Sequence, residues 1–297
     1  MRRASAIVML WASLQGASLE PRLYSNVPKG FNFLVAGYGY TQGALADNPA
    51  LELTDPELRV SSAIVGYARG FGIGGMSAKA GIVLPAMCID GTAEQNGTPV
   101  ARHVCGAGDA KMSVSVNLFG APALSMKQFA SYRQDTIVGV SLQLTVPTGQ
   151  YERDRLVNIG TNRWAIKPGV GISKAVARFI FELAADAEFY TANEHFLGDI
   201  TRKQEPVYST QGHIIYTFKN RVWIGIDANY FWGGEYVNDG RRSGEVLDNS
   251  RMGATLAVPI NPHHSLKFYG SSGVSTRVGT DFDMLGLLWQ YRWAEGY

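Results

Sequence analysis

The last stretch of the chain alternates between apolar and polar side chains. Every second residue from Leu285 to Trp293 is apolar, and the final three of these are aromatic, in the stretch LGLLWQYRW. The positions between them include Gln290 and Arg292. A period of two is that of a β-strand, because successive side chains point to opposite faces. One face of this strand therefore has to be buried against either a protein core or lipid.

The same alternation recurs from residue 31 onward, whereas amphipathic helical patterns are scarce. It predicts about twelve strands of close to ten residues, a length that suits tilted strands crossing a bilayer. The predicted strands cover residues 31–40, 60–71, 76–85, 109–119, 136–147, 164–173, 178–190, 207–218, 222–233, 251–260, 265–277 and 282–293.

The absence of charge on one face of these strands indicates which solvent that face meets. In the third to twelfth strands, with the last counted from Leu285, the more apolar register covers roughly 50 positions and carries no charge. Charged residues make up 18% of the chain, so about nine would be expected there. Arg or Lys on a lipid-facing strand position costs roughly 2–4 kcal/mol at mid-bilayer, which explains their exclusion. A soluble barrel encloses too little apolar volume for so many side chains, so we expect this face to meet lipid.

The connections between the strands alternate in length. Long polar loops are predicted at residues 41–59, 86–108, 148–163, 191–206 and 234–250, and tight turns at 174–177, 219–221 and 261–264. The connection at residues 120–135 is an exception, for which a short helix around 125–132 is predicted. Long loops at one end and tight turns at the other are typical of outer-membrane barrels. We therefore predict an all-β fold, a transmembrane antiparallel up-and-down β-barrel of about twelve strands with both termini periplasmic.

The N-terminus has the pattern of an export signal. Arg2 and Arg3 precede an apolar stretch at residues 4–14, and small residues follow up to Ser18. We predict a cleaved signal peptide at residues 1–18, a barrel domain at 19–297 and a location in the bacterial outer membrane. A net charge of only +2 without a run of Lys or Arg argues against nucleic-acid binding.

The chain has two cysteines, Cys88 and Cys105, in a segment rich in Gly, Asn, Thr and Pro. In an exported protein an isolated pair favours a disulfide that closes a loop. Free thiols and a metal site are the alternatives. His103 is the only additional ligand nearby, and three unevenly spaced ligands match no common zinc pattern.

Motifs for catalysis are weak. The glycines Gly70, Gly72 and Gly75 match a dinucleotide-binding pattern, but the residues after them alternate like a strand and do not suggest a helix. A tight turn is the better interpretation. The cluster His263-His264-Ser265 follows Asn261-Pro262 in a predicted turn, where polar residues are expected in any case. We predict no enzymatic activity, no cofactor and no metal.

The polar register supplies the candidates for a functional lumen. Charged groups inside a barrel need partners, and Lys167 on the neighbouring strand is the expected partner of the three carboxylates at 182, 186 and 188. A pH gate at His213 is an alternative to a purely structural role. The residues expected to line the lumen and to set its selectivity are Lys167, Glu182, Asp186, Glu188, His213, Asp227, Arg251 and Arg292.

Four segments resemble a bacterial outer-membrane "transporter" family named for the MetA-pathway of phenol degradation. They cover residues 136–175, 230–240, 249–268 and 283–293. The resemblance implies an outer-membrane barrel that admits small compounds, aromatic and hydrophobic molecules among them. It offers no catalytic residues to carry over to this chain.

From these observations we predict a monomeric channel for passive uptake of small molecules. The alternatives are a lipid-modifying hydrolase of the outer membrane and a structural or adhesive barrel. The expected partners are outer-membrane lipid, the solute and the barrel-assembly machinery. Either Trp293 or Tyr297 would provide the terminal aromatic residue that the machinery reads.

Overall fold

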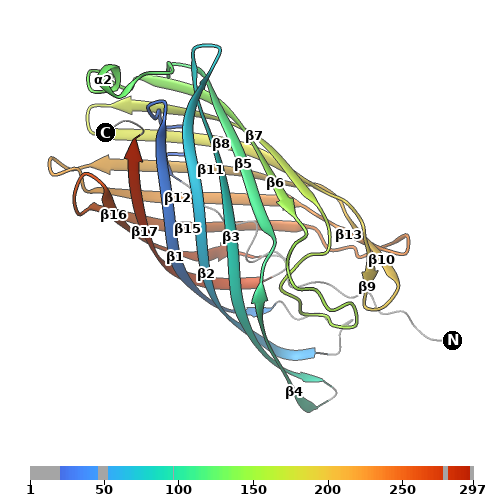
Figure 1. The fold of residues 1–297 in the computed structure, drawn as a ribbon. Helices are drawn as coiled ribbons and strands as arrows, with labels where there is room; N and C mark the ends of the chain where they lie inside the picture. Colours follow the sequence, from blue (N-terminus) through green and yellow to red (C-terminus); the bar gives the residue numbers. More distant parts are fainter. Residues whose placement is uncertain (1–20, 46–52, 96, 277–279, 295–297) are drawn as a thin grey trace.

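The computed structural model describes residues 21–45, 53–95, 97–276 and 280–294, and their strands close into one barrel (Figure 1). Within this part of the chain no helix has both the length and the apolar character to cross a membrane. The predicted signal peptide at residues 1–18 and Tyr297 lie outside the described residues.

Twelve antiparallel strands form the barrel wall, and β17 pairs with β1 to close it, which confirms the predicted fold. Each strand of the wall pairs with the wall strand that follows it in the sequence. The strands are β1 (Phe31–Leu45), β2 (Leu53–Ile73), β3 (Met76–Gln95), β5 (Ala110–Phe119), β6 (Thr136–Val146), β7 (Ala165–Val176), β8 (Phe179–Tyr190), β11 (Val207–Thr217), β12 (Trp223–Gly233), β15 (Leu247–Pro259), β16 (His264–Ser275) and β17 (Thr280–Ala294).

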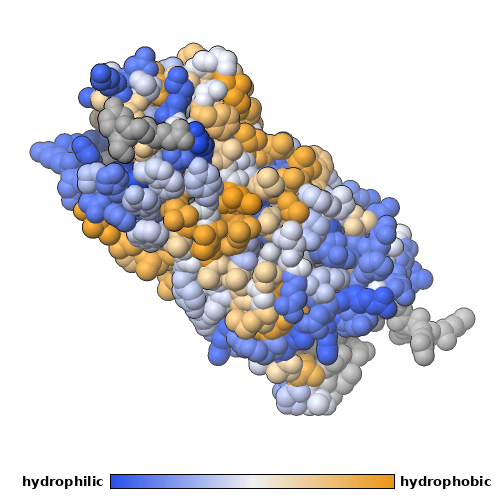
Figure 2. Space-filling view, viewed as in Figure 1, coloured by the Kyte–Doolittle hydropathy of each residue, from blue (hydrophilic) through white to orange (hydrophobic). Residues whose placement is uncertain are grey.

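The outer surface of the wall is apolar. Large hydrophobic side chains at alternate positions are exposed, among them Leu285 (68%), Leu183 (60%) and Ile226 (56%). Figure 2 shows hydrophobic side chains over the middle of the molecule and hydrophilic ones towards both ends. Because large exposed apolar areas are rare on soluble monomers, this belt marks the surface that contacts lipid.

The two ends of the barrel differ as predicted. Near the C-terminal end of β17 the connections are tight except at residues 120–135, and at the first of them Gly74 and Gly75 adopt positive φ angles of 56° and 82°. The glycine motif is therefore a turn between β2 and β3. The short helix α2 (Met126–Phe129) lies at this same end (Figure 1), within the connection for which a helix was predicted. Short turns identify this end as periplasmic.

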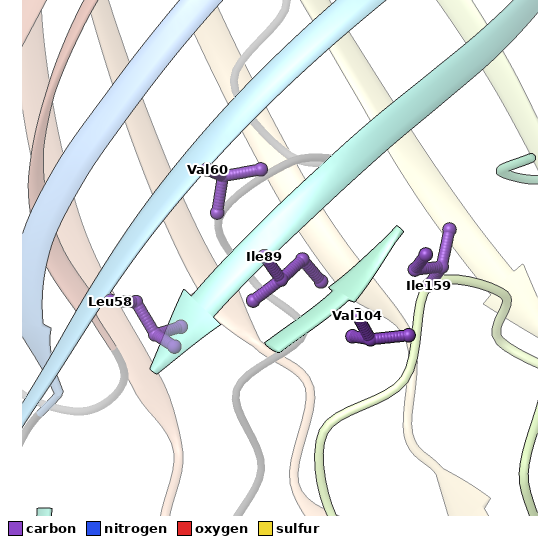
Figure 3. Packing of buried hydrophobic residues seen from close by; sticks show 5 residues of the cluster. All are labelled: Leu58, Val60, Ile89, Val104 and Ile159. Carbon is purple, nitrogen blue, oxygen red and sulfur yellow. The ribbon is translucent and has the colours of Figure 1, made fainter. Parts of the chain in front are cut away.

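The prediction of a loop at residues 86–108 is wrong. This segment is the second half of β3 together with β4 (Thr98–Ala107), which pair as a hairpin beyond the barrel wall. The alternation continues past the predicted end of the strand, so that Ile89 and Val104 bury their side chains against Leu58 and Val60 of β2 (Figure 3). Burial of one apolar face stabilises the extended hairpin, although its composition favours a loop.

Three of the other predicted long loops also contain strand residues. The prediction of a loop at residues 41–59 is wrong at both ends, because β1 continues to Leu45 and β2 begins at Leu53, and the two strands pair there. Residues 191–206 and 234–250 form a small antiparallel sheet at the extracellular end, where β9, β10 and β13 lie in Figure 1. Its strands are β9 (Asn193–Phe196), β10 (Ile200–Gln204), β13 (Tyr236–Asn238) and β14 (Arg241–Arg242).

Candidate functional site in the barrel lumen

The inward register of the wall carries the polar and charged side chains. Glu182, Glu188, His213, Asp227 and Arg251 are each less than 10% exposed, while their outward-facing neighbours are the exposed hydrophobics described above. Lys167, Asp186 and Arg292 are half-buried. The strand pairing therefore brings the candidate residues to the inner side of the wall, although they do not form a single cluster.

His213 and Asp227 form a buried pair on β11 and β12. The Nδ1 atom of His213 lies 2.6 Å from Asp227 Oδ1, and the two side chains are only 3% and 1% exposed. Thr255 donates from Oγ1 to Asp227 Oδ2 at 2.9 Å. Both carboxylate oxygens are thus occupied, as burial of a charge requires. Among the described residues no Ser, Thr or Cys side chain hydrogen-bonds to His213, so the pair lacks a nucleophile.

The carboxylates of β8 do not use the predicted lysine partner. Glu182 accepts a hydrogen bond from Ser173 Oγ at 2.9 Å, and Asp186 accepts one from Ser209 Oγ at 2.8 Å. Glu188 accepts from Tyr190 Oη at 3.1 Å. Within the described chain no ion pair joins Lys167 to any of them; Lys167 lies opposite Gln143 of β6. Hydroxyl groups of β7, β11 and β8 itself supply these hydrogen bonds, so the expected ion pairs with Lys167 are absent from the described residues.

Arg251 and Arg292 occupy different levels of the barrel. Arg251 Nη2 donates to Ser271 Oγ at 3.0 Å and to the Phe282 carbonyl at 2.9 Å. Its guanidinium carbon lies 3.6 Å from the centroid of the Phe282 ring. Arg292, in contrast, donates from Nε to the Pro262 carbonyl at 2.8 Å and thereby braces a periplasmic turn. Of the two arginines, only Arg251 lies near the extracellular half of the lumen.

An N-terminal segment, residues 21–30, crosses the periplasmic mouth of the barrel, a feature that the sequence analysis missed. Near its end Gly30 donates its backbone N–H to Gly70 at 2.9 Å, and Asn26 Nδ2 donates to the Pro122 carbonyl at 3.2 Å. At the opposite wall the Arg22 N–H donates to Glu182 Oε2 at 2.7 Å. The segment therefore joins the β1–β2 side of the mouth to the β8–β11 side.

Tyr24 lies at the centre of this segment and is 3% exposed. Its ring covers Gly139 of β6 and Gly171 of β7, and a Cβ atom at either glycine would collide with it. Its hydroxyl lies 3.1 Å from Ser141 Oγ. Two opposed glycines on the inner face of neighbouring strands are the sequence signal that could have indicated a ring packed inside the barrel.

The extracellular mouth has an apolar inner rim. Leu58, Val60, Ile89 and Val104 face inward from β2, β3 and β4, and Ile159 packs against them from the loop after β6 (Figure 3). Each of these residues is at most 8% exposed, so they form a closed apolar cluster at this mouth.

Beside this rim, a buried arginine fastens the extracellular sheet. The Arg202 guanidinium carbon lies 3.5 Å from the centroid of the Phe196 ring and 4.8 Å from that of Tyr236. Arg202 is 2% exposed, and burial lowers its pKa to about 10. The guanidinium group, stacked on both rings, holds β9, β10 and β13 together.

Of the predicted cysteine alternatives, the disulfide is present. Cys88 of β3 and Cys105 of β4 lie directly opposite each other, with their Cα atoms 4.0 Å apart. The disulfide links two strands of a hairpin and does not close a loop. In the part of the chain that the structure describes, no group of three His, Cys, Asp or Glu side chains could hold a metal ion.

A closed twelve-strand barrel with an apolar exterior and charged interior defines the class of outer-membrane β-barrel proteins. The chain belongs to the family described as "Putative MetA-pathway of phenol degradation", whose model matches residues 46–287. No protein with a curated description matches the chain.

Solved structures similar to this one include the following three. The COG4313 outer membrane channel from Pseudomonas putida F1 has a TM-score of 0.78 at 20% identity, and the match covers 92% of this chain and 99% of that chain. The transport unit of the autotransporter AIDA-I from Escherichia coli follows with 0.55 at 12% identity, covering 95% of both chains. The β domain of the Bordetella autotransporter BrkA gives 0.51 at 11% identity, covering 90% and 100%. At these identities the matches establish the fold.

Proposed function

We propose that this protein is an outer-membrane channel for passive uptake of small molecules, with aromatic or hydrophobic compounds as the main solute class. The observation that carries the proposal is the inversion of polarity across a closed wall. Leu183 and Ile226 face lipid, while Glu182 and Asp227, each one residue away, face a charged interior. Family membership, with a description that refers to phenol degradation, supports the solute class.

The path through the barrel has three parts. A solute first passes the extracellular mouth, beside the packed rim around Ile89 and Val104. It then passes the charged inner face, where Asp186, Asp227 and Arg251 lie on different strands. The periplasmic mouth is crossed by residues 21–30, so this segment has to shift for a large solute to leave on that side.

The remaining features of the proposal concern export and assembly. Export with a signal peptide at residues 1–18 and insertion by the barrel-assembly machinery would bring a monomer to the outer membrane. The apolar belt is its contact with lipid. A closed wall has no free strand edge to pair with a second copy, which supports a monomer.

Hydrolysis is the less favoured function. The buried His213–Asp227 pair has the orientation of a catalytic base, but within the described part of the chain no hydroxyl or thiol group hydrogen-bonds to the imidazole. A nucleophile within hydrogen-bond reach of the base is the minimum requirement for that chemistry. We therefore assign the pair to the lumen wall.

The test is liposome swelling and planar-bilayer recording with the purified full chain. We expect small aromatic solutes to permeate faster than sugars of the same mass, and discrete current steps in bilayers. Boiled protein from the same preparation is the control for leakage caused by detergent. Liposomes that remain impermeable to every small solute, with folded protein inserted, would overturn the channel proposal.

A further inference from the structure

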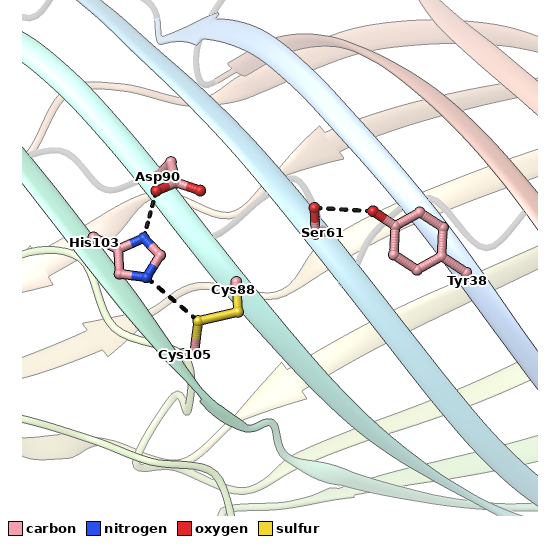
Figure 4. Close-up of a disulfide and its surroundings, with 6 residues drawn as sticks. All are labelled: Tyr38, Ser61, Cys88, Asp90, His103 and Cys105. Carbon is pink, nitrogen blue, oxygen red and sulfur yellow. Dashed lines mark hydrogen bonds and ion pairs between the residues drawn. A yellow bond between two sulfur atoms is a disulfide. The ribbon is translucent and has the colours of Figure 1, made fainter.

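The disulfide of the β3–β4 hairpin has an imidazole directed at one of its sulfur atoms. His103 Nε2 lies 3.6 Å from Cys105 Sγ, and both side chains project from β4 on the same face (Figure 4). On the other side of the ring, Nδ1 lies 2.5 Å from Asp90 Oδ1. The pairing of β3 with β4 creates this order, because Asp90 lies opposite His103 and Cys88 lies opposite Cys105.

This group is on the outside of the barrel and open to solution. The side chains of His103 and Asp90 are 68% and 57% exposed, Cys105 is exposed, and Cys88 is half-buried. The inward residues of the same hairpin, Ile89 and Val104, are buried. Exposed disulfides are the ones that solution thiols can reach, whereas structural disulfides resist reduction.

From this geometry we propose that Cys88–Cys105 is a thiol–disulfide exchange site for low-molecular-weight thiols, in which Cys105 is the leaving thiolate. A carboxylate at Nδ1 favours the tautomer whose Nε2 lone pair faces the sulfur, and it stabilises the imidazolium that forms. A cation beside one sulfur makes that sulfur the better leaving group. Attack is therefore directed to Cys88 Sγ.

The incoming thiol R–SH gives its proton to His103 Nε2, and its sulfur attacks Cys88 Sγ. The Cys88–Cys105 bond breaks, a Cys88–SR bond forms, and the electron pair leaves with Cys105 as a thiolate next to the imidazolium. The net change is one thiol oxidised to a mixed disulfide and one protein sulfur reduced. His103 is the catalytic residue, and Asp90 is a positioning residue.

The hairpin keeps the two cysteines together after the bond has broken. β3 and β4 remain paired from Ala86 opposite Ala107 to Gln95 opposite Thr98, on both sides of the disulfide. The Cys105 thiolate therefore stays opposite Cys88 and can expel the added thiol again. This arrangement makes the site reversible and leaves the barrel wall unchanged.

The first test measures how fast glutathione reduces the disulfide of the folded full chain in detergent micelles, followed by alkylation and mass spectrometry. We expect His103→Gln to slow reduction about tenfold, a small effect for acid–base assistance because the site is exposed. His195→Gln, at an exposed position on β9, is the matched control and should keep the original rate. Equal rates for the original chain and His103→Gln would overturn the proposal.

The second test identifies which sulfur is attacked and does not depend on absolute rate. Quenching a single turnover with a maleimide should place glutathione on Cys88 and the maleimide on Cys105. Asp90→Ala, which frees the ring, should spread glutathione over both sulfurs, and Asp90→Asn, which retains an acceptor, should restore most of the preference. An even distribution in the original chain would refute the assignment. Unchanged heat-modifiable gel mobility shows that each variant is folded.

Discussion

The backbone N–H of Arg22 donates to Glu182 Oε2 at 2.7 Å, although 160 positions of sequence separate the two residues. The Arg22 guanidinium continues the contact, because Nη2 donates to Thr217 Oγ1 at 2.8 Å and the group lies 4.8 Å from the Trp223 ring. Residues 21–30, which belong to no strand of the wall, are thus attached to its inner side. A small number of such contacts holds residues 21–30 across the periplasmic mouth.

Removal of the Tyr24 ring should open the periplasmic mouth. Tyr24→Ala empties the space over Gly139 and Gly171 and removes the contact with Ser141. We expect a higher single-channel conductance with an unchanged fold. Tyr38→Ala, on the outer face, is the matched control. If Tyr24→Ala conducts no more than the original chain, residues 21–30 do not limit the pathway.

Breaking the buried His213–Asp227 pair should destabilise the barrel. Asp227→Ala leaves the imidazole and the Thr255 hydroxyl without an acceptor, and loss of one partner of a buried pair costs about 3–5 kcal/mol. Asp227→Asn retains an acceptor and should cost about 1–2 kcal/mol. Urea unfolding in micelles, monitored by gel mobility, measures the loss of unfolding free energy in both variants. Similar losses for the two variants would show that hydrogen-bond geometry does not matter at this position.

A charge on the outer wall should be costly only within the lipid belt. Ile226→Arg places a guanidinium at an outward position of β12 and should cost roughly 2–4 kcal/mol. Val100→Arg, at an exposed apolar position of β4, should cost less than about 0.5 kcal/mol, because that strand lies in water. The free energy of unfolding in lipid vesicles, measured for each variant, gives the two costs. Equal costs would mean that the β12 position does not face lipid.

Acid should loosen the loop that contains β13 and β14. The Gly244 N–H and the Arg242 guanidinium, which both donate to Glu235, lower the pKa of that carboxyl group. A lowered pKa in the folded state means that the stabilisation is complete above the ordinary Glu range and disappears as the pH falls through the lowered value. Hydrogen exchange in residues 234–246 should therefore accelerate at low pH. Glu235→Gln should remove this dependence, and Glu194→Gln should not.

The alternation of side chains determined the wall of the barrel. Leu285, Leu287 and Trp289 occupy the outward face of β17, and Gln290 and Arg292 the inward face, because a period of two leaves only two faces. The lengths of the connections, which can be counted in the sequence once the strands are known, distinguished the two ends of the barrel. Composition was a weaker guide. The segment around Cys88 and Cys105 has the composition of a loop but forms a hairpin, because Ile89 and Val104 pack against an apolar surface.

The sequence by itself therefore determined the class of fold, the surface for lipid and the residues that face inward, because these follow from local periodicity and the cost of charge in lipid. Only the tertiary structure decided which inward groups meet. Lys167 lies opposite Gln143, Glu182 binds the N–H of Arg22, and Tyr24 rests on Gly139 and Gly171. These contacts depend on strand register and on the path of residues 21–30 across the mouth, and both are set when the barrel closes.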